Sequence, residues 1–136
     1  MFKKFGFLAL FIVVTGLSGW VLRAQQKPAA GPTVTRTVLN QQDLAIPGYA
    51  AALVRVQLPV GSREGRHHHA GTLIATVAEG TMTLEVAGKV STYKTGETFA
   101  VSPNTVHEGM NKSGAPITLI ASFVFPKDQP MTVQEK

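Results

Sequence analysis

The chain has 136 residues and a mass of 14.5 kDa, which is enough for one small domain. Charged residues make up 15% and hydrophobic residues 44%, which excludes a mostly disordered chain, and the absence of cysteine excludes disulfides and thiolate metal sites. The net charge is +5, but three of the basic residues, Lys3, Lys4 and Arg23, flank one apolar segment. After Ala24 the chain has ten basic and eight acidic residues. That small balance, without a basic cluster, argues against nucleic-acid binding.

The first segment has the layout of an export signal. A short basic region, Met1–Lys4, precedes eighteen uncharged residues, 5–22. We interpret residues 1–24 as a signal peptide cleaved after Ala24, and residues 25–32 as a polar linker. An uncleaved membrane anchor is the alternative, because eighteen helical residues reach about 27 Å, nearly the thickness of a bilayer core. Both interpretations predict a domain outside the cytoplasm: periplasmic or secreted, or anchored to the inner membrane and facing outward.

Residues 33–136 form the predicted domain, in which strand-like runs alternate with turn signals every eight to twelve residues. The run 73–77 is continuously apolar, so we expect it to be buried on both faces, and we expect a hairpin turn at Gly88-Lys89. About eight short strands in one unit predict an all-β fold, a closed barrel or jelly roll. The expected strands are Thr33–Leu39, Leu53–Leu58, Leu73–Val77, Met82–Val86, Val90–Tyr93, Thr98–Val101, Val106–Met110 and Ile117–Phe125, with an edge strand at Met131–Val133.

The four histidines fall in two places, His67-His68-His69 and His107. Alternate side chains share a face of an extended strand, so His67 and His69 should project together while His68 points away. His107 follows a turn and can add a third imidazole from a neighbouring strand. By themselves these residues leave two interpretations open: a metal site, or solvated and hydrogen-bonded histidines without a metal.

The residues around the histidines resemble the cupin family. In GSREGRHHHAGTLIATVAEG, residues 61–80, the two outer glycines and the His-x-His unit have the spacing of the first cupin motif. In GETFAVSPNTVHEGMN, residues 96–111, Gly96, His107 and Asn111 match the second. The resemblance covers about residues 33–133. It implies a cupin β-barrel, a double-stranded β-helix, whose open end holds one metal ion on His67, His69 and His107.

The sequence departs from the family pattern at Leu73, where the first motif has a metal-binding glutamate. By alternation Leu73 should face the same interior as His67 and His69, but its side chain cannot bind a metal. In the second motif Ser102 and Asn104 replace the usual proline and glycine. Asn104 is a mild change, because asparagine tolerates the left-handed backbone of such turns.

The resemblance implies one divalent transition-metal ion, and imidazole ligands suit iron, zinc, manganese, nickel or copper without choosing among them. Some three-histidine cupins are iron dioxygenases, so the leading hypothesis is a metal-dependent enzyme, a dioxygenase acting on a small molecule. Lewis-acid isomerisation or hydrolysis is a second enzymatic option. The alternatives are a non-catalytic module that binds a metal or small ligand, and an empty barrel. The family habit of pairing through strand edges also implies a homodimer.

No general base is identifiable from the sequence. Glu108 should point away from the site by strand alternation, and Glu64 and Arg66 are expected on a loop at the mouth of the barrel. Arg63 and Arg66 are candidates for contact with an anionic substrate, although loop arginines are more often only solvated.

Overall fold

The computed structural model describes residues 31–136, which form ten β-strands and no helix. The all-β class predicted from the sequence is confirmed. In this part of the chain no helix has the length and apolar character needed to cross a membrane. The interpretation of residues 1–24 as a signal peptide or anchor, and of most of the linker 25–32, falls outside the described residues and stays a prediction.

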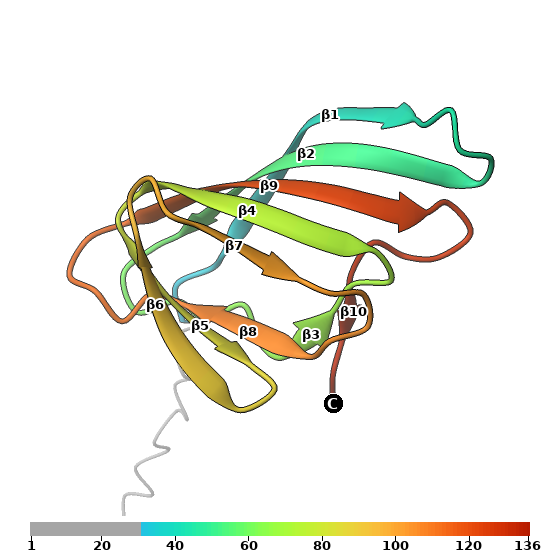
Figure 1. Cartoon of the computed structure of the whole chain (residues 1–136). Coiled ribbons are helices and arrows are strands. Elements are labelled where there is room, and N and C mark those ends of the chain that lie inside the picture. Colours follow the sequence, from blue (N-terminus) through green and yellow to red (C-terminus); the bar gives the residue numbers. More distant parts are fainter. Residues whose placement is uncertain (1–30) are drawn as a thin grey trace, which may run out of the picture.

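The strands form two five-stranded antiparallel sheets, stacked as an upper and a lower layer in Figure 1. The first sheet has the order β1 (Thr35–Asp43), β2 (Tyr49–Leu58), β9 (Ile117–Pro126), β4 (Thr72–Glu79) and β7 (Thr98–Val101). The second has the order β10 (Val133–Gln134), β3 (His67–His68), β8 (His107–Met110), β5 (Thr81–Val86) and β6 (Lys89–Lys94). The chain therefore has one strand more than the nine expected, because the histidine run forms the short strand β3, and the expected C-terminal edge strand lies slightly later, at β10.

The core lies between the two sheets and follows from the alternation of the sequence. In β2 every second residue from Ala50 to Leu58 is buried, and in β9 every second residue from Ile117 to Phe125 is buried. The register places Val54 of β2 opposite Ala121 of β9, so these buried positions line up on one face. Burial of a large aliphatic side chain stabilises a fold by about 1.5–3 kcal/mol, and this inner face supplies most such side chains.

One strand departs from its expected burial. We expected residues 73–77 to be buried on both faces, but in β4 only Leu73, Ala75 and Val77 are buried, and Ile74 is 54% exposed. No element of the described chain covers the outer face of this sheet. A continuous apolar run does not reveal whether a second layer covers its outer face, and here that expectation was wrong.

Two turns contain residues with positive φ, and this backbone conformation explains the residue types found there. The β5–β6 hairpin turns at Ala87 and Gly88, with φ values of 48° and 83°, while Lys89 already belongs to β6. Our expected turn at Gly88-Lys89 was therefore one residue too late. Positive φ at both central positions is typical of the tight turn that suits twisted hairpins. Asn104 adopts a φ of 59°, the left-handed conformation expected of it.

The fold brings the two histidine segments together at one end of the second sheet. β3 pairs with β8, and His67 lies directly opposite His107 in that register. The turn before β8 is tied to the first segment, because the backbone N–H of Asn104 donates to the carbonyl of His69 at 2.7 Å. Residues some forty positions apart in the sequence are thus held side by side by backbone hydrogen bonds.

Candidate metal centre

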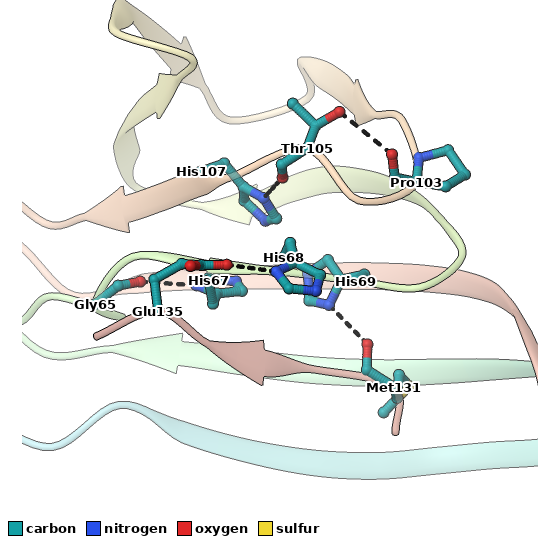
Figure 2. Close-up of polar contacts among 9 residues, drawn as sticks. All are labelled: Gly65, His67, His68, His69, Pro103, Thr105, His107, Met131 and Glu135. Atoms are coloured by element: carbon teal, nitrogen blue, oxygen red, sulfur yellow. Dashed lines mark hydrogen bonds and ion pairs between the residues drawn. The ribbon is translucent and has the colours of Figure 1, made fainter. Parts of the chain in front are cut away.

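His67, His69 and His107 converge in the interior of the barrel. Their side chains are 2%, 5% and 3% exposed, and one possible ligand nitrogen from each lies within 4.8 Å of the other two. The three ring centroids are 4.3–5.0 Å apart. His68 points away, with its Nδ1 2.5 Å from a carboxylate oxygen of Glu135 (Figure 2). The orientations agree with the strand alternation expected from the sequence.

Each of the three rings is oriented by a backbone carbonyl (Figure 2). The Nδ1 atom of His67 lies 2.7 Å from the carbonyl oxygen of Gly65, and that of His107 lies 2.9 Å from the carbonyl oxygen of Thr105. The Nδ1 atom of His69 lies 2.9 Å from the carbonyl oxygen of Met131. A carbonyl oxygen only accepts hydrogen bonds, so each Nδ1 carries the proton, and in the neutral ring Nε2 keeps a free electron pair.

Burial favours the neutral form of the His69 and His107 rings. The pKa of His69 is lowered to about 4, mainly by burial and in smaller part by the neighbouring His107 and His67, against the opposing effect of the Met131 carbonyl. Burial also lowers the pKa of His107. Neutral imidazoles with Nδ1 protonated are the state in which Nε2 can bind a metal ion.

The site fits a metal ion by the chemistry of its donors. The Nε2 atom of His107 is buried and has no hydrogen-bond partner among the described residues. Leaving a buried polar atom unpaired costs about 1–3 kcal/mol, a cost that a bound ion would remove. Three neighbouring imidazoles, each with a hydrogen-bonded Nδ1 and a free Nε2, are the donor set of many zinc, iron and copper sites.

A small apolar cavity adjoins the three histidines. The cavity volume is about 20 Å³, which is room for at least one water. Leu73 lines this cavity and is 6% exposed, so it faces the same interior as the histidines, as the strand alternation predicted. The remaining apolar lining comes from Val56, Ala75, Met82, Leu84, Phe99, Leu119, Ala121 and Phe123.

Two charged residues in the cavity wall were not assigned to it from the sequence. Glu64, expected on the loop at the barrel mouth, lines the cavity, and so does Arg36 of β1. An Arg36 Nη2 nitrogen donates to Glu64 Oε1 at 2.8 Å. Burial is the main influence on the pKa of His107 and lowers it, while the charge of Glu64 acts in the opposite direction. One feature of the sequence could have indicated that another group enters the cavity here. Gly109 lies on the same face of β8 as His107 and has no side chain, which leaves space beside that histidine.

The other charged candidates lie outside the cavity wall. Arg63 donates two hydrogen bonds to Glu108, at 2.8 and 2.7 Å, and this pairing holds the pKa of Glu108 below its usual range. Arg66 is exposed, and neither it nor Arg63 lines the cavity. Glu108 does not line the cavity either, in agreement with its expected direction.

Asn111 of the second motif holds a loop in place by hydrogen bonds and does not line the cavity. Its side-chain amide donates to the carbonyls of Leu58 and Ala115 at 2.9 and 2.8 Å, and its side-chain oxygen accepts from Ser113. The residue is 2% exposed and lies outside the cavity lining. Asn111 therefore fastens the loop between β8 and β9 to the end of β2.

The chain is similar in structure to several solved proteins. A Klebsiella pneumoniae protein, described as an uncharacterized conserved protein with a double-stranded beta-helix domain, aligns with a TM-score of 0.62 and 24% identity over 81% of this chain and 90% of that one. An oxalate oxidase aligns with a TM-score of 0.60 and 21% identity, over 78% of this chain and 57% of that one. The DMSP lyase DddQ from Ruegeria pomeroyi aligns with a TM-score of 0.56 and 15% identity, over 62% and 42%.

These structural similarities show the fold alone, since all the identities are below 25%. No curated protein sequence matches the chain. The cupin domain family matches residues 54–129, which is more than half of the chain and includes the three histidines. With two facing antiparallel sheets and these three imidazoles inside the barrel, the chain belongs to the cupin family, as a three-histidine variant.

Proposed function

We propose that His67, His69 and His107 bind one divalent transition-metal ion through Nε2, and that the chain uses it on a small molecule. The observation that carries this proposal is the shared orientation of the three rings. Each Nδ1 donates to a backbone carbonyl, which leaves the Nε2 electron pair free on each ring, and one ring nitrogen from each histidine lies within 4.8 Å of the other two. When bound, such an ion supplies Lewis acidity or redox chemistry. The chain's own part is to hold three neutral ligands and exclude bulk water.

The same proposal extends to catalysis and compartment. Three protein ligands leave coordination positions open, which is the pattern of catalytic rather than structural metal sites. A metal-dependent enzyme is therefore the first hypothesis, with dioxygenase or isomerase chemistry, and a non-catalytic binding module is the alternative. The proposed compartment is the periplasm or the exterior of the cell, supported by the basic and apolar pattern of residues 1–24.

Metal content after purification without added metal tests the binding step. We expect about one ion per chain, and Ala substitution of His67, His69 or His107 should abolish it. The matched control is His68→Ala, because His68 faces Glu135 outside the cavity. Equal loss of metal from His68→Ala would contradict the assignment of the ligands, and wild-type protein without metal after addition of each candidate ion would contradict the proposed site.

Oxygen uptake separates the enzyme from the binding module. Metal-loaded protein is mixed with a panel of thiols, diketones and phenols, and dioxygen consumption is recorded with the His107→Ala variant as the blank. Consumption that depends on His107 supports a dioxygenase. A compound that raises the midpoint temperature of thermal unfolding of the protein, without being consumed or converted, supports the binding module instead.

A further inference from the structure

The Glu64 carboxylate lines the cavity, and only one of its two oxygens accepts a hydrogen bond from the described part of the chain. The Glu64 side chain is 9% exposed, and its Oε1 accepts from Arg36 at 2.8 Å. Within residues 31–136 no protein hydrogen bond reaches Oε2. In this described part of the chain Glu64 is also the one carboxylate that lines the cavity.

The free oxygen of Glu64 points toward the face of β8 that carries His107. Gly109 is two residues beyond His107 and therefore shares its face of the strand. A Cβ atom built on Gly109 would lie 2.3 Å from Glu64 Oε2 and 2.4 Å from the terminal methyl of Met82. The carboxylate thus occupies the space that a side chain at position 109 would fill, beside the third histidine.

Two independent contacts fix this position. The backbone N–H of Glu64 donates to the carbonyl of Gly109 at 2.9 Å, which ties the loop to β8. Arg36 approaches from the other sheet, where its register partner is the buried Val56 of β2, so its side chain lies on the inner side of that sheet at the rim of the cavity, 37% exposed. A carboxylate held this way loses little conformational freedom when a ligand binds.

We propose that Glu64 Oε2 is the hydrogen-bond acceptor that selects the ligand of this site, with Arg36 as its positioning residue. The inference rests on the proposed metal function. The other polar atoms of the cavity wall belong to the three imidazoles and Arg36, and the rest of the lining is apolar. The class of ligand that fits is a small molecule with a metal-binding oxygen and an N–H or O–H donor next to it.

Two matched probes test this acceptor in the full chain, kept in mild detergent and loaded with zinc. Acetohydroxamic acid and its N-methyl derivative bind a metal through the same two oxygens, and only the first has an N–H donor. Calorimetry should show that the wild type prefers the N–H probe. In the Glu64→Gln variant the ratio of the affinities for the two probes should fall about 10-fold, because a charge-assisted hydrogen bond is lost. Glu64→Asp, which withdraws the oxygen by one methylene, should lose part of it.

The control is Glu79→Gln, which removes an equal charge from an exposed carboxylate outside the cavity. This variant should keep the full preference. An unchanged preference in Glu64→Gln and Glu64→Asp, with one zinc ion still bound, would overturn the role of Glu64 and leave the metal site intact. Failure of the wild type to bind zinc when it is loaded, before any probe is added, would instead overturn the proposed function, so the two failures are distinguishable.

Discussion

Leu73 is the residue that distinguishes this site from the family pattern. It occupies the position of the motif's glutamate, lines the cavity and is 6% exposed. Its strand partners are Val101 and Phe123, so the wall at this point is apolar on both sides. Leu73 thereby contributes no ligand and leaves one side of the proposed metal site open.

Replacement of Leu73 by glutamate should restore an anionic ligand. We expect Leu73→Glu to raise metal affinity by about 1–3 kcal/mol, comparable to a charge-assisted hydrogen bond, and to slow any reaction that needs the open position. Without metal the buried carboxylate should destabilise the domain by several kcal/mol. Thermal denaturation with and without metal measures both effects.

The neighbouring position supplies the control for that experiment. Ile74 lies on the outer face of the same strand and is 54% exposed, so Ile74→Glu should change neither metal affinity nor the response to metal. If metal fails to stabilise Leu73→Glu relative to its own metal-free form, Leu73 does not adjoin the metal.

At the scale of elements, the C-terminal strand β10 holds the site from outside. It pairs with β3, which carries His67. The carboxylate of Glu135, just after β10, contacts the His68 ring on the outer face of the sheet. The segment just before β10 supplies the Met131 carbonyl that orients His69, and the Thr132 hydroxyl lies 3.2 Å from the same Nδ1. This segment lies beyond the matched cupin region, which ends at residue 129. It therefore adds a partner for His69 that the motifs do not contain.

Removal of this segment should weaken the metal site without emptying it. A chain that ends at Asp128 loses the Met131 carbonyl and the β10–β3 pairing, so the His69 ring is free to rotate. Loss of such an outer partner typically costs 10- to 100-fold in metal affinity, and we expect a loss in that range by competition with a chelator.

Glu135→Gln is the companion variant, since it removes only the carboxylate next to His68 and leaves the carbonyl of Met131 in place. It should bind metal about as tightly as the wild type. A shortened chain with unchanged metal affinity would show that β10 has no part in holding His69.

At the scale of the whole molecule, the buried imidazoles of His69 and His107 make the stability of the metal-free protein depend on pH. The pKa of His69 falls to about 4 on folding, mainly because of burial. The unfolded chain, with a histidine pKa near 6.5, then binds more protons than the folded chain between about pH 6.5 and pH 4. The free energy of unfolding must therefore decrease as the pH falls through that window, and burial lowers the pKa of His107 in the same direction.

Urea unfolding of the metal-free protein at pH 7.5 and pH 5 measures this linkage. His69 alone should lower the free energy of unfolding by about 2 kcal/mol between these values, since one pKa unit corresponds to about 1.36 kcal/mol. The His69→Gln variant should lose correspondingly less over the same interval. Equal losses in the two proteins would mean that His69 is not protonated preferentially in the unfolded state.

Local patterns were sufficient for much of the fold and part of the site. The alternation along β2 and β9 predicted which side chains face the core, because side-chain direction has a period of two in any strand. The same rule predicted that His67 and His69 project together and that His68 does not. It could not predict that Ile74 is exposed, since that depends on what covers the sheet.

The sequence by itself determined the all-β class, the approximate positions of the turns, the strand alternation and the three candidate ligands, because each depends on residues close together in the chain or on a recurring motif. The tertiary structure decided which distant groups complete the site. Arg36 reaches Glu64 across 28 positions, and Met131 reaches His69 across 62. The sequence does not reveal such partners, since strand pairing, and not sequence separation, determines which backbone and side-chain atoms become neighbours.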